Sequence, residues 1–155
     1  MGISDESYQE FIAQVHLLLV SDDWTVITDV PEPFTHLFTR IQQKTIVSTR
    51  QALVFLHDTG FSQQEIGAFI EKIYASETCE GNTPLFPAIT IIIFVQDRPH
   101  NITWIQQHGK KRNVLQSRFT ISWVVNLQDK ILYRHHGLPL VKQGAQKIEE
   151  ALHSF

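Results

Sequence analysis

Apolar positions along the chain follow two spacings, one typical of helices and one typical of strands. Near the N-terminus, Ser7 and Glu10 have the spacing of a capping box, in which two side chains satisfy two free amides at the start of a helix. Apolar residues then recur along one helical face: Tyr8, Phe11, Ile12, Val15 and Leu19. This pattern predicts a first amphipathic helix that ends at Asp22.

Three further helices are predicted, at residues 62–74, 99–108 and 145–155. Ser62 and Glu65 form a second capping box at the start of the first of these. Gly109 is expected to end the 99–108 helix, because glycine commonly follows the last helical turn. Residues 109–113 are then expected to form an exposed turn.

Strands are predicted where β-branched and aromatic residues gather, at residues 24–30, 45–57, 89–95 and 119–127. The 89–95 segment is apolar throughout, which is typical of a strand buried on both faces at the centre of a sheet. Residues 131–134 are expected to pair with 119–127 through a turn near Gln128.

Residues 33–43 carry conflicting signals. The helical spacing is carried by Phe34, Leu37, Phe38 and Ile41. Pro33 suits the first turn of a helix, whereas the Thr and Phe residues favour a strand. We expect a helix here.

The order of these elements predicts a single α/β domain over residues 1–155. Its expected architecture is three-layered, with a mixed, mostly parallel sheet, helices on both faces and a C-terminal antiparallel hairpin. The chain has one cysteine, no basic leader and no apolar stretch long enough for a bilayer. We therefore expect a cytoplasmic protein without a membrane partner.

Charge is unevenly distributed along the chain, although the net charge is only −3. Residues 1–97 hold 4 basic and 13 acidic side chains, a balance of −9, whereas residues 98–147 hold 9 basic side chains and one acidic one, a balance of +8. Such asymmetry can mark an interaction surface. The alternatives are that the two parts pack together in the fold, or meet across a dimer interface.

The basic segment predicts a binding face for an anionic partner. Its candidate contacts are Arg98, Lys110, Lys111, Arg112 and Arg118. Flexible basic side chains of this kind bind phosphates without reading sequence. The first functional hypothesis is therefore a non-enzymatic binding or regulatory domain whose partner is a nucleic acid, a nucleotide or an acidic protein. A homo-oligomer with no small-molecule site is a separate interpretation.

The alternative hypothesis is an enzyme, a Mg²⁺-dependent phosphoesterase or nuclease. Asp29, Asp58 and Asp97 each follow a predicted strand, and ligands of open α/β sheets bind at the carboxyl ends of strands. Carboxylates gathered there would hold Mg²⁺, with His57 or His100 as a proton carrier. The competing interpretation is that these aspartates serve as turn residues and helix caps.

The opening helix, the strand and the β-rich region after them resemble the start of the PD-(D/E)XK nuclease core. That core carries an acid on one strand and an acid-x-Lys triplet on the next. The nearest match here is Gln42-Gln43-Lys44, with Gln in place of the acid, and Asp29 or Glu32 as the upstream acid. Because Gln is a poorer metal ligand than a carboxylate, the resemblance also allows an inactive relative.

Overall fold

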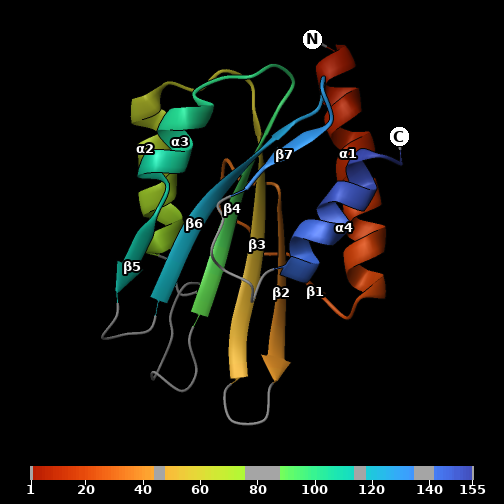
Figure 1. The fold of residues 1–155 in the computed structure, drawn as a ribbon, viewed down its shortest axis with the longest axis vertical. Helices are drawn as coiled ribbons and strands as arrows, with labels where there is room; N and C mark the ends of the chain where they lie inside the picture. Colours follow the sequence, from red (N-terminus) through yellow and green to blue (C-terminus); the bar gives the residue numbers. More distant parts are fainter. Residues whose placement is uncertain (1, 44–47, 76–87, 114–117, 135–141, 155) are drawn as a thin grey trace.

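The computed structural model describes residues 2–43, 48–75, 88–113, 118–134 and 142–154. Across these ranges the chain has an α/β fold with four helices and a seven-stranded mixed sheet (Figure 1). None of the helices in these ranges combines the length and the apolar character that crossing a bilayer requires.

The helices are α1 (Gly2–Ser21), α2 (Gln63–Tyr74), α3 (Ile102–His108) and α4 (Lys142–Leu152). The strands are β1 (Thr25–Ile27), β2 (His36–Gln43), β3 (Ser48–Asp58), β4 (Ala88–Gln96), β5 (Lys111–Asn113), β6 (Arg118–Asn126) and β7 (Ile131–Tyr133). Strand β4 is the central apolar strand predicted from the sequence, and every one of its residues is buried.

The strands lie in the order β1-β2-β3-β4-β6-β5, and β7 also pairs with β6. Pairing is parallel between β3 and β4 and between β4 and β6, and antiparallel in the other pairs. The sheet is mixed, as predicted, but parallel pairing is confined to its centre rather than predominant. The C-terminal antiparallel hairpin, β6 with β7, is confirmed.

The helix predicted over 33–43 is wrong, because residues 36–43 form strand β2. It pairs antiparallel with β3 along its whole length, from His36 opposite Phe55 to Gln43 opposite Ser48. Leu37 and Phe38 point to opposite sides of the sheet, and each is buried in a different core cluster. Tertiary burial on both sides therefore overrides the helical spacing of the apolar residues.

Alternate residues of the strands belong to two hydrophobic clusters, one on each side of the sheet. One cluster joins α1 and α4 to Phe38, Phe55 and Trp123, and the other joins α2 and α3 to Leu37 and Phe94. Figure 1 shows α1 beside α4 and α2 beside α3.

The two capping boxes predicted from the sequence have different outcomes. Ser62 caps α2 as predicted, and both reciprocal bonds with Glu65 are present. Ser7 and Glu10 do not cap α1, because the helix begins earlier, at Gly2, and both residues lie inside it. The same short motif therefore marks a helix start only when the chain before it is not already helical.

A short strand lies where an exposed turn was predicted. Lys111–Asn113 forms β5, which pairs antiparallel with the first residues of β6. Gly109 ends α3 as predicted, and a Cβ there would lie 2.5 Å from both the Ile105 carbonyl oxygen and Ser122 Cβ. Only glycine fits this close approach, which directs the chain from α3 into the edge of the sheet.

Candidate functional site

The three candidate aspartates lie at one end of the sheet but in different surroundings. Asp58 is the last residue of β3, in register with Gln96, and Asp97 follows that glutamine directly. Asp29 lies two residues beyond β1, and β2 separates β1 from β3. Asp58 and Asp97 are therefore close in the fold, whereas Asp29 lies farther along the same edge.

Asp58 organises the loop that leads into α2. It is 3% exposed, and its Oδ1 accepts hydrogen bonds from the amides of Gly60 and Phe61, at 3.0 and 2.9 Å. Its Oδ2 accepts a third, from Gln96 Nε2 at 2.9 Å. These contacts fit the predicted role of a turn residue, since both carboxylate oxygens serve the protein's own donors.

Asp97 instead contacts a histidine. Its Oδ2 lies 3.2 Å from His57 Nε2, and the two side chains are 29% and 11% exposed. The helix-cap role considered for Asp97 is wrong, because Asn101 holds the cap position of α3. His57 and Asp58 point to opposite sides of β3, so the Asp97–His57 pair lies on the side of α1 and Asp58 on the side of α2.

Tyr8 of α1 covers the Asp97–His57 pair. Its ring stacks on His57 with 4.6 Å between centroids and 5° between planes. Its hydroxyl is hydrogen-bonded to Thr35 Oγ1, which lies 2.8 Å from His36 Nδ1. A continuous line of contacts thus runs from Asp97 through His57, Tyr8 and Thr35 to His36.

Burial sets the acid–base character of Tyr8. Desolvation raises the pKa of the Tyr8 phenol to about 12, although the hydrogen bond with Thr35 partly opposes the shift. The phenol therefore keeps its proton at neutral pH. It is therefore a neutral hydroxyl in the line of contacts, and either oxygen can be the donor in its hydrogen bond with Thr35.

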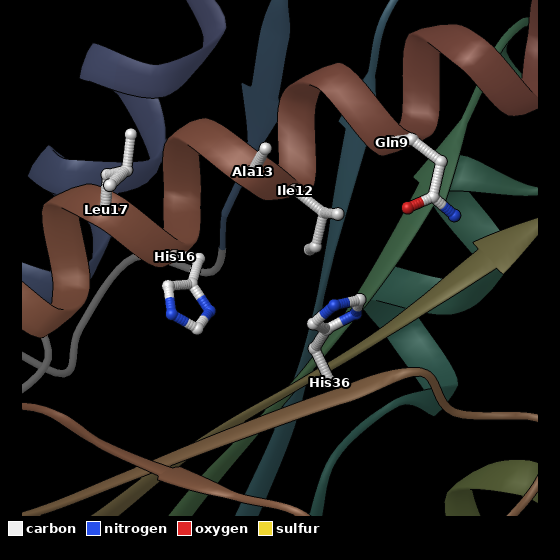
Figure 2. Close-up of a pocket in the computed structure, with 6 residues that line it drawn as sticks. All are labelled: Gln9, Ile12, Ala13, His16, Leu17 and His36. Carbon is white, nitrogen blue, oxygen red and sulfur yellow. The ribbon is translucent and has the colours of Figure 1, made fainter.

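A groove opens beside this line, between α1 and β2. Its volume is about 440 Å³, and it is lined by Gln9, Ile12, Ala13, His16, Leu17 and His36 (Figure 2). The His16 ring projects from α1 and the His36 ring from β2, and both enter the space between the two elements. Burial first, and the neighbouring His16 second, lower the pKa of His36.

The groove residues could not be recognised as a site from the sequence. Gln9, Ala13 and His16 look like the polar side of an amphipathic helix, and His36 fell within a segment predicted as helix. A signal that would have helped is strand alternation in 36–41, which places His36 and Phe38 on one side and Leu37 on the other.

His100, the other candidate proton carrier, is engaged away from the groove. Its Nε2 lies 2.7 Å from the Phe61 carbonyl oxygen, and its amide donates to Gln96 Oε1 at 3.0 Å. Within the described ranges, no group of three or more His, Cys, Asp or Glu side chains is arranged to hold a metal ion. A shared Mg²⁺ site of Asp29, Asp58 and Asp97 therefore gains no support from their positions.

The candidate nuclease signature is divided between the two ends of β2. Asp29 and Glu32 precede this strand, whereas Gln42 and Gln43 are its last two residues. The length of β2, about 25 Å at the usual rise per residue, separates the two parts. Lys44 lies outside the described residues.

The candidate anion-binding residues form two separate groups. Lys111 pairs with Thr120 and Arg112 with Phe119, and Arg118 is opposite Asn113, so these residues gather at the amino end of β6. Arg98 lies just beyond the carboxyl end of β4, which is level with Asn126. About 20 Å along the strands separates the group at the amino end of β6 from Arg98, so Arg98 belongs to a different part of the surface.

Two side chains of the group at the amino end of β6 are open to solvent. Lys110 and Arg112 are exposed, and neither takes part in the ion pairs found among the described residues. Lys111 is 37% exposed and forms an ion pair with Glu71 of α2. We call Lys110, Lys111, Arg112 and Arg118 the basic edge.

No protein-family model matches the chain, and neither does any curated protein or solved structure. Two features carry chemistry that packing does not require: the basic edge, and the groove with its two imidazoles.

Proposed function

We propose that the protein is a non-enzymatic binding or regulatory domain that binds nucleic acid through the basic edge. The observation that carries this function is the exposure of Lys110 and Arg112, unpaired among the described residues, beside the strand that begins with Arg118. Cationic side chains on a solvent-exposed edge can follow a phosphate backbone without deep burial.

The strand order supports this function. The acidic part of the sequence ends at residue 97, directly after β4, and the strands of the basic part, β5, β6 and β7, all lie beyond β4 in the sheet. The strands of the acidic part and those of the basic part thus occupy opposite halves of the sheet, although α4, which carries Lys147 of the basic part, packs against α1. An anionic polymer would be attracted to the half of the sheet that ends in β5 and repelled from the half that ends in β1.

Nucleic acid is favoured over an acidic protein by the form of the basic edge. Long, mobile cations on a short edge strand suit a repeating row of phosphates, whereas protein interfaces are usually built around buried aromatic anchors. The described large apolar residues that are exposed, Leu17, Val20, Ile41 and Ile131, lie on elements other than β5.

An Mg²⁺-dependent phosphoesterase is the less supported alternative. Its ligands would include Asp58, whose two oxygens already accept three hydrogen bonds, and Asp97, which contacts His57. Binding Mg²⁺ there would require replacing these contacts.

We also infer that the chain is a single domain in three layers. The support is the pair of core clusters, one containing α1 and α4 and the other α2 and α3, fed by alternating residues of the same strands. In this arrangement the sheet separates the groove from α2 and leaves the basic edge at its margin.

The test is the salt dependence of binding to a short fluorescently labelled DNA duplex, followed by anisotropy from about 50 to 200 mM salt. We expect the wild-type affinity to fall as salt rises. In the double variant Lys110→Gln/Arg112→Gln, two phosphate contacts are lost, so the slope of log affinity against log salt should decrease by about 2.

A matched control removes two charges elsewhere in the basic segment. Lys130 lies in the turn between β6 and β7, and Lys147 pairs with Glu150 on α4, so Lys130→Gln/Lys147→Gln should leave the slope close to that of the wild type. Equal losses in the two double variants, or binding that survives loss of Lys110 and Arg112, would contradict the basic edge as the contact surface. Binding to a polyglutamate peptide but not to DNA would indicate an acidic protein partner.

A further inference from the structure

An aromatic stack lies at the end of α3, immediately before the basic edge. The indole of Trp104 and the imidazole of His108, one helical turn apart, are stacked with 4.7 Å between ring centroids and 18° between planes. His108 Nδ1 also lies 3.0 Å from the Trp104 carbonyl oxygen. Two contacts therefore hold the imidazole against the indole on the surface of α3.

The indole is the inner ring of this stack and the imidazole is the outer one. Trp104 is half-buried and packs against the core cluster that contains α2 and α3. Its Cη2 reaches Gly67 of α2 and would lie 3.7 Å from a Cβ at that position. His108, by contrast, is exposed, so its ring adds little to the core. The core thus positions an aromatic surface whose outer member is in contact with solvent.

The aromatic stack and the basic edge are contiguous in the chain. Lys110, which is exposed and outside the ion pairs of the described residues, follows His108 by two residues. Their Cα atoms are therefore at most about 7 Å apart. Gly109 between them ends α3, and its carbonyl oxygen accepts a hydrogen bond from the Ser122 hydroxyl of β6 at 3.0 Å. This bond fixes the chain between the aromatic ring and the cations.

The cations of β5 lie on both sides of the sheet edge. Lys111 forms an ion pair with Glu71 of α2, so it faces the side of α2 and neutralises a carboxylate that would repel a phosphate there. Arg112 pairs with Phe119, which packs against the cluster on the side of α1, so Arg112 faces that side. A polymer that crosses the edge strand from the aromatic stack therefore meets cations along its path.

We propose that the basic edge binds single-stranded nucleic acid, DNA or RNA, with one base stacked on the imidazole of His108. This inference rests on the proposed function and names the class of its ligand. Surfaces that bind single strands combine cations that follow the backbone with aromatic rings on which bases stack, because every base has a π-face. The bases of a duplex are already stacked on one another, so a duplex can use the cations but not the ring.

The test compares an oligothymidylate of about ten nucleotides with an abasic strand of the same length, which keeps the phosphates and lacks the bases. Binding to the full chain is followed by the anisotropy of a fluorescent label. We expect the wild type to bind the thymidylate about 5- to 150-fold more tightly than the abasic strand, the range that stacking of one base contributes. An oligouridylate measures RNA in the same way, and a preference between the two identifies the natural strand.

Three variants separate stacking from phosphate contacts. His108→Ala should lower the thymidylate affinity to that of the abasic strand and leave the salt slope unchanged, because the phosphate contacts remain. His108→Phe keeps an aromatic ring and should retain most of the difference between the strands. His153→Ala is the matched control, since His153 is an exposed histidine just after α4, and it should bind both strands as the wild type does. Circular dichroism shows whether each variant is folded.

The outcomes distinguish failure of the stacking from failure of the proposed function. If the wild type binds the thymidylate, uridylate and abasic strands equally, and Lys110→Gln/Arg112→Gln still reduces the salt slope, base stacking is overturned and the basic edge remains a phosphate-binding surface. Absence of binding to every strand and to the duplex would overturn both. A difference between thymidylate and abasic strands that persists in folded His108→Ala would overturn His108 as the ring that holds the base.

Discussion

Tyr8 connects the Asp97–His57 pair with the groove between α1 and β2. Its ring stacks on His57, which contacts Asp97, and its hydroxyl reaches Thr35 and, through it, His36 of the groove. The residue is 2% exposed, so its phenol lies in a low-dielectric environment where an unpaired hydroxyl is unfavourable. The contribution of Tyr8 to the free energy of unfolding should therefore depend on whether its phenolic oxygen is protonated.

The sign of that dependence follows from the raised pKa. Below pH 10.0 the phenol is protonated in both the folded and the unfolded chain. Between pH 10.0 and about 12 the unfolded chain loses the proton and the folded chain keeps it, so the free energy of unfolding decreases as pH rises. Two pKa units correspond to a decrease of about 3 kcal/mol.

We predict that Tyr8→Phe removes this alkaline decrease. The variant loses a hydrogen bond worth about 1 kcal/mol near neutral pH, but its free energy of unfolding should change less than that of the wild type above pH 10.0. The measurement is urea unfolding as a function of pH, with Tyr133→Phe as the control. Parallel alkaline decreases in wild type and Tyr8→Phe would show that Tyr8 is not the group responsible.

At the residue scale, the sequence identified individual residues of the site but not the contacts between them. His57 and Asp97 were separate candidates, and Tyr8 was predicted to be in the core, but their contact was not predictable. Periodicity shows which side of an element a residue occupies, whereas the meeting of α1, β3 and the end of β4 depends on strand order. The same limit applies to His16 and His36.

At the element scale, the two capping-box motifs provide a matched pair. Ser62 Oγ accepts the Glu65 amide at 3.1 Å, and Glu65 Oε1 accepts the Ser62 amide at 3.1 Å. Ser62→Ala should lower the free energy of unfolding by about 1 kcal/mol, because a free amide at the start of α2 loses its acceptor.

Ser7→Ala is the control, because Ser7 lies inside α1, where alanine has the higher helix propensity. It should leave the free energy of unfolding unchanged or slightly higher in denaturant titrations. A loss as large as that of Ser62→Ala would indicate that α1 begins at Ser7 rather than at Gly2.

Long apolar elements were predictable, and short or polar ones were not. Strands β3, β4 and β6 and helices α1, α2 and α4 lie close to the predicted segments, because each buries enough apolar surface to leave a pattern. Strand β5 is made of Lys111, Arg112 and Asn113, which pair through the backbone, so no apolar pattern marks it. Strand β2 was misassigned because its apolar residues fit both a helix and a strand buried on two sides.

At the scale of the whole molecule, the sheet is strongest at its centre. Strands β3 and β4 are hydrogen-bonded on both sides, and residues 88–96 are buried without exception. Strands β1, β5 and β7 have three residues each and lie at the margins. Local opening costs least where few backbone bonds and little buried surface must be given up.

Hydrogen exchange should therefore divide the molecule into a slow centre and fast margins. We predict that amides of 53–55 and 91–93 exchange most slowly, and those of 25–27, 111–113 and 131–133 much faster. Exchange followed by NMR or mass spectrometry measures this directly. The basic edge lies in one of the fast segments, so a DNA duplex bound there should slow exchange at 110–113 and leave 25–27 unchanged. Slow exchange at 111–113 without DNA, increasing with protein concentration, would instead indicate that a second copy of the chain covers this edge.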